Sequence, residues 1–146
     1  MNWRSGLISS KRITETSQAR LSIISRPKFG TKTIVMPLPR IQRGEIWVVD
    51  QGYLGKVRPV AVLSIPFLPN ERTLFIVVPH TTSVVGTRFE VKLNHSALNA
   101  RAFDVQQTAA VQAVKFSRRL GILDPKQLLT LEKTLAELLG LKLAPS

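Results

Sequence analysis

Short apolar runs rich in β-branched residues dominate the sequence from Gly44 onward. Glycine, proline and asparagine interrupt these runs at intervals that are typical of small all-β domains. The pattern predicts strands near 44–50, 57–64, 73–80, 87–93 and 103–116, and we expect the last to be two short strands. Because every apolar run is far shorter than the roughly 20 residues that span a bilayer, we expect a soluble body and no membrane association.

Near the C-terminus the leucines recur every three or four residues, which is the spacing of a helix. Asp124 is a good N-cap, Pro125 suits the first helical position, Gln127 completes a capping-box-like spacing, and Gly140 ends the pattern. These signals predict a helix of roughly 15 residues, with a leucine stripe that packs on the sheet or, in part, serves a dimer contact. Strands and helix together predict a mainly β fold with one C-terminal α-helix, as a small, strongly bent sheet or barrel.

The basic charge of the chain is distributed unevenly. There are 21 Lys and Arg against 9 Asp and Glu, a net charge of +12. Residues 1–35 carry a large share of this excess, contain many serines and show little apolar periodicity. We therefore divide the chain into a basic, flexible N-terminal arm (1–35) and a barrel domain (36–146). The arm has three interpretations: an RNA-attracting tail, an organelle transit peptide, or sequence upstream of a true start at Met36.

The sequence predicts no metal site and no cofactor. It has no cysteine, which excludes disulfides and cysteine-based zinc sites. The two histidines, His80 and His95, lie far apart, and there is no HExxH motif or carboxylate-rich loop. Any catalysis is therefore expected to run without metal.

Three stretches stand in a suggestive order: RGEIWVVD at 43–50, GKVRPVAVLS at 55–64 and VPHTTS at 78–83. In that order and spacing they resemble the MazF/PemK family of toxin endoribonucleases. FDVQQ at 103–107 and RRLG at 118–121, before the capped helix, also look like that family's second half. The resemblance covers about residues 41–141.

The resemblance implies a compact SH3-like β-barrel of the plasmid-toxin type, a homodimer, and a cytoplasmic toxin of a type II toxin–antitoxin system. It also implies metal-independent, sequence-specific cleavage of single-stranded RNA, and neutralisation by a cognate antitoxin. A strongly basic groove predicts that this antitoxin supplies an acidic, partly disordered segment.

Two catalytic positions carry over from the family. The arginine of its RP motif falls on Arg58, and the threonine after its third strand falls on Thr81. Here two threonines adjoin, and counting back from Ser83 selects Thr82 instead. His80 occupies a position that is more often aliphatic in the family.

The chemistry would use the RNA's own 2′-OH, which attacks the neighbouring phosphorus and leaves a 2′,3′-cyclic phosphate and a 5′-OH. Arg58 would stabilise the developing negative charge, and the hydroxyl of Thr81 would orient the nucleophile. The general base stays open, because an arginine is a poor base at neutral pH. His80 is one candidate, although strand alternation would turn His80 and Thr82 away from Thr81, and a packing histidine is the alternative.

RNA binding requires cations and exposed aromatic rings. The candidate residues are Tyr53, Lys56, Phe67, Arg88, Gln107 and Lys115. Further basic residues that would line a phosphate track, or only solvate the surface, are Lys92, Arg101, Arg118 and Arg119. The aromatics expected in the core are Trp47, Phe75 and Phe89.

Three other polar residues keep two interpretations each. Gln106 and Gln107 would read base edges or merely complete a sheet. Asp104 would form a buried ion pair with an arginine or serve the function directly. His95 lies in a polar loop and is expected to be solvated.

Two other functions remain compatible with the sequence. One is a gyrase-poison-like toxin that binds a protein target through a similar barrel, with its signature in the C-terminal helix. The other is a basic RNA-binding barrel without catalytic activity. The motifs around Arg58 and Thr81 favour the nuclease, because a gyrase poison has no need of them.

Overall fold

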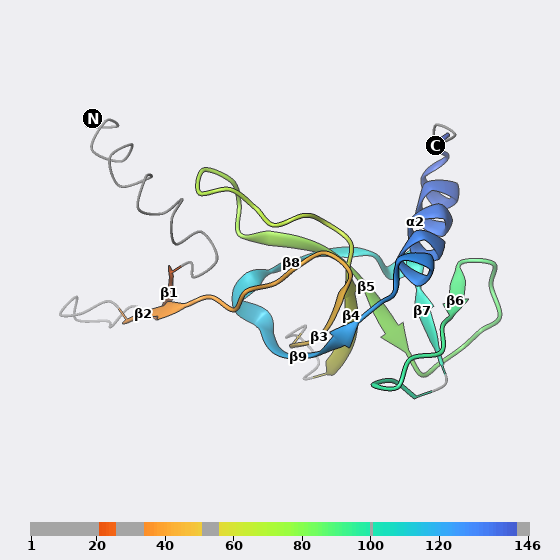
Figure 1. Cartoon of the computed structure of the whole chain (residues 1–146), viewed down its shortest axis with the longest axis horizontal. Coiled ribbons are helices and arrows are strands. Elements are labelled where there is room, and N and C mark those ends of the chain that lie inside the picture. The colour runs from red at the N-terminus through yellow and green to blue at the C-terminus, as the bar shows by residue number, and fades with distance from the viewer. Residues whose placement is uncertain (1–20, 26–33, 51–55, 100, 143–146) are drawn as a thin grey trace.

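The computed structural model describes residues 21–25, 34–50, 56–99 and 101–142 (Figure 1). The strands within these residues are β1 (Leu21–Ser25), β2 (Ile34–Pro37), β3 (Glu45–Asp50), β4 (Val57–Val62), β5 (Leu74–Thr81), β6 (Glu90–Lys92), β7 (Ala102–Asp104), β8 (Ala109–Gln112) and β9 (Phe116–Ile122). Two short 3-10 turns, η1 (Val105–Gln107) and η2 (Ala113–Lys115), flank β8, and one α-helix, α2 (Pro125–Leu139), follows β9.

Seven of these strands form one antiparallel sheet in the order β6-β7-β5-β4-β3-β9, with β8 also paired to β5. The same edge of β5 serves two partners in succession. Its first half, Leu74–Val77, pairs with β8, and its end, His80–Thr81, pairs with β7. The predicted fold class, mainly β with one C-terminal helix, is therefore confirmed.

The structure refines the predicted strands at the C-terminal end of the sheet. The expected strand at 87–93 is reduced to the three residues of β6, and the stretch 103–116 holds β8 and parts of two other strands, separated by η1 and η2. The pattern did not predict β9 as a strand. Most of its residues are exposed or only half-buried, so polar side chains interrupt the alternation that would have signalled it.

A second, two-stranded sheet precedes the main one. β1 and β2 pair in antiparallel register from Leu21↔Pro37 to Ser25↔Ile34, which the weak apolar periodicity of this region did not indicate. In Figure 1 this pair lies at the opposite end of the molecule from α2. After β2 the chain is anchored by Leu38 and Ile41, which are both buried in the core. The rest of the predicted N-terminal arm, 1–20 and 26–33, lies outside the described residues.

The central strands β3, β4 and β5 are buried on both faces. Trp47, Val60 and Val77 belong to one apolar cluster, whereas their chain neighbours Ala61 and Val78 belong to another, which packs against leucines of α2. This arrangement explains why the strands appear in the sequence as continuous apolar runs rather than as alternating ones. The burial predicted for Trp47, Phe75 and Phe89 is confirmed.

Phe67 is a correction to the sequence analysis. The two neighbouring prolines led us to expect a loop aromatic that would stack on a base. The chain around Phe67 is indeed irregular, but the ring is buried and packs at 5.3 Å, centroid to centroid, on Phe75. A face already covered by core side chains is not available to a nucleobase, so Phe67 contributes to the core instead.

Helix α2 begins and ends where the sequence predicts. The carboxylate of Asp124 accepts the N–H of Gln127 at 2.8 Å, and the side chain of Gln127 accepts the N–H of Asp124 at 3.1 Å, which completes the capping box. Gly140 adopts the left-handed conformation (φ 70°) that ends the helix. Leu131 is fully buried against the sheet, while Leu129 and Leu139 are exposed.

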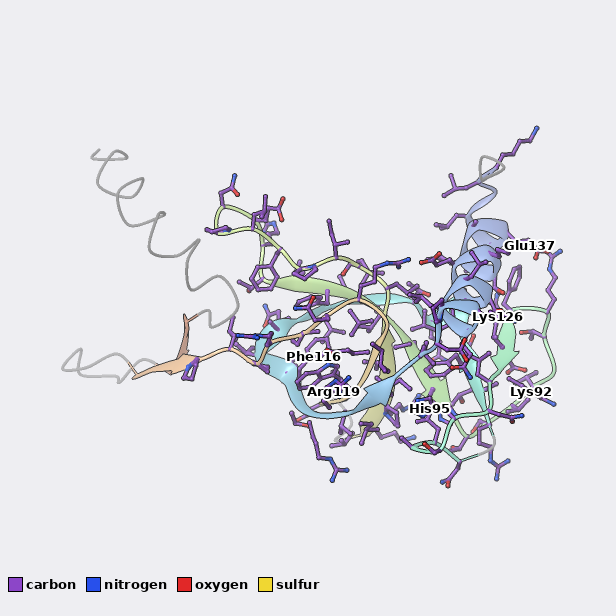
Figure 2. All side chains as sticks on the ribbon, viewed as in Figure 1. Lys92, His95, Phe116, Arg119, Lys126 and Glu137 are labelled. Atoms are coloured by element: carbon purple, nitrogen blue, oxygen red, sulfur yellow. The ribbon has the colours of Figure 1, made fainter. Side chains whose placement is uncertain are left out.

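One buried carboxylate ties β3 to β9. Glu45 Oε2 accepts the indole N–H of Trp47 and the backbone N–H of Gln42, each at 2.8 Å. Glu45 Oε1 accepts Nε–H of Arg119 on β9, also at 2.8 Å. Figure 2 shows Arg119 and Phe116 on the same curved strand. The conspicuous Glu–Ile–Trp sequence is therefore explained by structure, since the acid satisfies a buried indole.

We predict that Glu45→Ala lowers the free energy of unfolding by about 1–3 kcal/mol, because it leaves the buried indole N–H of Trp47 without a partner. Chemical denaturation followed by tryptophan fluorescence measures the change. Glu137→Ala is the matched control: its exposed ion pair with Arg88 contributes little, so we expect a change of less than about 0.5 kcal/mol. Equal effects of the two substitutions would contradict the structural role of Glu45.

Candidate functional site

An open cleft of about 800 Å³ lies where β4 begins and β5 ends. Its walls come from four parts of the chain: the start of β4, the end of β5 with the loop after it, the loop between β6 and β7, and the turn η1. The lining residues relevant here are Lys56, Arg58, His80, Thr81, Thr82, Ala97, Leu98, Asn99, Asp104 and Gln107. The structure thus brings together six of the catalytic and RNA-binding candidates proposed from the sequence: Lys56, Arg58, His80, Thr81, Thr82 and Gln107.

The pairing of β4 with β5 positions Arg58 and Thr81. Val60 faces Pro79 and Val62 faces Val77, and continuing this antiparallel register by two residues sets Arg58 opposite Thr81. Residues two apart on a strand share a face, so both side chains project to the same side of the sheet. Both also line the cleft.

The hydroxyl of Thr81 is held by a local turn. Its Oγ1 accepts the N–H of Ser83 at 3.1 Å, while the possible bond from this hydroxyl to the Ser83 carbonyl is long, at 3.4 Å. The donor side of the hydroxyl is therefore only weakly used, and a stronger acceptor entering the cleft would take it. Thr82 also lines the cleft but is exposed, and of these two threonines only Thr81 lies within β5.

His80 is buried in the wall of the cleft. Its ring packs edge-to-face on Phe103 of β7 at 5.2 Å, so it projects to the opposite side of β5 from Thr81, as strand alternation predicted. It nevertheless lines the same cleft as Thr81. Burial lowers the pKa of His80 below its usual 6.5, a hydrogen bond to the Asn99 backbone opposes this, and Arg101 adds to the lowering. The ring is therefore neutral at pH 7.

Asp104 and Gln107 line the cleft together, and the carboxylate of Asp104 holds two neighbouring N–H groups. Its Oδ1 accepts the N–H of Gln106 at 3.1 Å and its Oδ2 accepts the side-chain amide of Gln107 at 2.7 Å. These bonds cap η1 and orient the amide of Gln107. The ion pair that the sequence analysis offered for Asp104 is not among the salt bridges of the described residues.

Gln107 also borders a second, shallower groove of about 620 Å³. Leu74 and the residues of β8 form most of this groove, and Lys115 lies on its rim. The two depressions share Gln107, so Lys115 and Arg58 belong to neighbouring parts of one surface.

Several basic residues proposed from the sequence lie outside the cleft. Arg88 forms an ion pair with Glu137 of α2 at 3.3 Å and its guanidinium covers the ring of Phe89 at 4.6 Å. Arg119 is held by Glu45. Lys92, Arg101 and Arg118 are exposed and are not among the lining residues. Tyr53 lies outside the described residues.

Nothing in the sequence indicates that the loop between β6 and β7 contributes to the site. Ala97, Leu98 and Asn99 line the cleft, but nothing in their local pattern places them beside β5. His95, in the same loop, is not solvated as expected. It is half-buried, with Nδ1 accepting the N–H of Ala97 at 3.1 Å and Nε2 lying 2.9 Å from the Ile122 carbonyl.

Cationic side chains dominate the charge of the cleft. Lys56 and Arg58 line it together with a single carboxylate, Asp104, whose oxygens already accept two N–H groups. Among the described residues, no three His, Cys, Asp or Glu side chains are grouped so as to hold a metal ion. No helix in this part of the chain is long and apolar enough to cross a membrane.

The sequence model of the PemK-like, MazF-like toxins of type II toxin–antitoxin systems matches residues 42–139. The chain belongs to this toxin family. The match includes every lining residue of the cleft and the whole of α2, and it begins after β2. No curated protein matches the sequence.

Solved structures of an endoribonuclease and of MazF toxins share the fold. One, described as an endoribonuclease in complex with its cognate antitoxin from a mycobacterial species, has a TM-score of 0.61 at 20% identity, over 71% of this chain and 99% of that one. The MazE–MazF complex of Deinococcus radiodurans has a TM-score of 0.60 at 21% identity, over 72% of this chain and 98% of that one. Mycobacterium tuberculosis toxin MazF-mt6 has a TM-score of 0.57 at 24% identity, over 68% of this chain and 99% of that one. At these identities the likeness establishes the fold.

Glu90 shapes the loop that carries Val85 into the cleft. Its carboxylate accepts the N–H groups of Val85, Gly86 and Thr87 at 2.8, 2.6 and 3.1 Å. The bond from Val85 lowers the pKa of Glu90 most, desolvation opposes it, and the bonds from Gly86 and Thr87 and the charge of Lys92 add to the lowering. The carboxylate therefore holds the loop in its charged form.

We predict that the loop stays ordered above pH 4.5, the usual pKa of this carboxyl, and loosens as the pH falls through the lowered pKa, because protonation removes the charge that binds the three N–H groups. NMR chemical shifts of the Gly86 amide measure the transition. Glu90→Gln should give the loosened spectrum already at neutral pH. Glu71→Gln, in a different loop where the carboxylate accepts one N–H, should leave Gly86 unchanged, and a Gly86 response to both substitutions would contradict the assignment.

Proposed function

We propose that this toxin is an endoribonuclease that cuts single-stranded RNA and leaves a 2′,3′-cyclic phosphate and a 5′-OH. The observation that carries the proposal is that Arg58, two residues before Val60, and Thr81, two residues after Pro79, both line one cleft rich in positive charge. Family membership and the MazF-like fold support the same conclusion. The nucleophile comes from the RNA itself, so the reaction needs alignment and charge stabilisation rather than a bound metal.

Arg58 meets the negative charge that develops on the non-bridging phosphate oxygens. Its guanidinium carries a fixed, planar set of donors that matches a phosphate. Its backbone is paired with Val49 of β3, so the side chain starts from a rigid base. Donors positioned in this way stabilise the transition state without reorganising during the reaction.

Thr81 orients the attacking 2′-OH or one phosphate oxygen. Its hydroxyl accepts a hydrogen bond from Ser83 and is weakly used as a donor, so it can donate to an RNA oxygen in the cleft. Holding the reacting oxygen near its target saves most of the entropy that alignment would otherwise cost.

Lys56, Gln107 and Lys115 extend the binding surface beyond the reacting phosphate. The lysines attract the RNA backbone, and Gln107, whose amide Asp104 orients, presents a fixed hydrogen-bonding edge to a base. We also propose a homodimer and an acidic antitoxin segment that competes with RNA for this surface, since carboxylates satisfy the same cations.

We predict that the purified protein cuts single-stranded RNA in the presence of EDTA, and that Arg58→Ala lowers the rate by about 100- to 1,000-fold, the usual effect of removing one oxyanion donor. End-group analysis of the products identifies the cyclic phosphate. Arg72→Ala, which removes an exposed arginine outside the cleft, should cut like the parent. RNA that is bound but recovered intact by the parent would instead support a non-catalytic RNA-binding barrel.

We predict that Thr81→Val lowers kcat by at least about tenfold, because it removes the hydroxyl and keeps the side-chain shape, while Thr81→Ser retains most of the activity. Single-turnover cleavage measures the chemical step. Thr82→Val is the matched neighbour and should stay close to the parent. The reverse ranking would assign the role to Thr82.

A further inference from the structure

Both histidines of the chain contact the loop between β6 and β7 (residues 93–99 and 101), here called the wall loop because Ala97, Leu98 and Asn99 line the cleft. They approach it from different sides. His80 belongs to β5, whereas His95 belongs to the loop itself and reaches toward β9. Figure 2 shows His95 beside the end of β9.

The hydrogen bonds of His95 indicate which ring nitrogen donates and which accepts. Nδ1 accepts the N–H of Ala97, so the proton of the neutral ring lies on Nε2, which donates to the Ile122 carbonyl at 2.9 Å. The imidazole also lies against the bare backbone of Gly121: a Cβ there would come within 2.7 Å of Cε1 of His95. The glycine therefore provides the space in which His95 bridges the loop to β9.

The hydrogen bonds of His80 define a second anchor. Its ring donates to the backbone of Asn99, and Nε2 is buried without a partner, so the donating atom is Nδ1. The ring is fixed against Phe103. Among charged groups, Arg101 of the wall loop acts on the ring, and Lys56, Arg58 and Asp104 line the same cleft.

A buried nitrogen without a partner is costly, and an aliphatic residue in this packed position would avoid that cost. The bond from His80 to Asn99 is the compensating contact that the structure offers for it. The far end of the loop is held independently, where Gln127 of α2 donates to the Asn94 carbonyl at 2.8 Å. The wall loop is thus fixed at Asn94, His95 and Asn99.

We propose that His80 and His95 are positioning residues that latch the wall loop onto β5 and β9, and thereby complete the RNA-binding cleft opposite Arg58. This inference rests on the proposed function for its substrate. Neither imidazole needs to touch RNA. Their effect passes through Ala97, Leu98 and Asn99, so it falls on substrate binding more than on the chemical step.

Two substitutions unlatch the loop by different routes. His80→Leu removes the bond to Asn99 and replaces the unpartnered nitrogen by carbon, so we expect the melting temperature to stay equal or rise. Gly121→Ala displaces the imidazole of His95 without altering a histidine. In each variant we expect KM for a short single-stranded RNA to rise about tenfold, the size of one lost hydrogen bond, with kcat within about twofold of the parent.

The conservative variant His80→Asn is the rescue. Its amide nitrogen is bonded to Cγ, as Nδ1 is, so its N–H can donate to the Asn99 carbonyl in place of Nδ1, and we expect KM to return to within about threefold of the parent. Thr134→Ala, on a helix residue that bonds only within α2 and lies outside the cleft, should leave KM and kcat unchanged.

Amide hydrogen exchange tests the latch without RNA. The amides of Ala97 to Asn99 should exchange faster in His80→Leu and Gly121→Ala than in the parent and in His80→Asn. Unchanged exchange together with unchanged KM in both unlatched variants would overturn the proposal, and so would a loss confined to kcat. If the parent cuts no RNA, the proposed function fails, while the exchange measurement still decides whether the histidines hold the loop.

Discussion

The hydrogen-bond register between β4 and β5 is the constraint on which the cleft depends. Val60 faces Pro79 across it, and its continuation brings Arg58 and Thr81 into one cleft. The register holds because each strand is also fixed from its other side. β4 is paired to β3 from Val57 to Ala61, and β5 is paired to β8 and then to β7. A slip of one residue would turn Arg58 to the opposite face of the sheet. Apolar residues buried on both faces make such a slip very unfavourable.

Those buried side chains also explain which parts of the fold were predictable. Continuous apolar runs located β3, β4 and β5, and the capping signals at Asp124 and Gly140 located α2, because in each case the residues that make the element also carry its pattern. β9 was not predicted because most of its residues are exposed or half-buried and carry no apolar pattern. Phe67 was misjudged because a loop residue can turn its ring into the core, and only tertiary packing decides that.

The candidate site likewise has a part that the sequence predicts and a part that it does not. Arg58 and Thr81 follow from motifs on strands, where residue spacing translates directly into facing side chains. The wall loop does not, because its place beside β5 depends on contacts between Asn99 and His80 and between His95 and Ile122, residues that are distant in the sequence. Such contacts have no local signature, and a histidine that forms them looks the same in the sequence as a solvated one.

The loop closed by Glu90 has a consequence for the RNA binding that we propose. Three consecutive backbone amides that converge on one carboxylate have the geometry of a phosphate-binding nest, but the protein supplies its own anion there. An incoming phosphate would have to compete with a tethered carboxylate at high local concentration. Capture of the polyanion then depends on lysine and arginine side chains rather than on main-chain dipoles, and affinity becomes strongly sensitive to ionic strength.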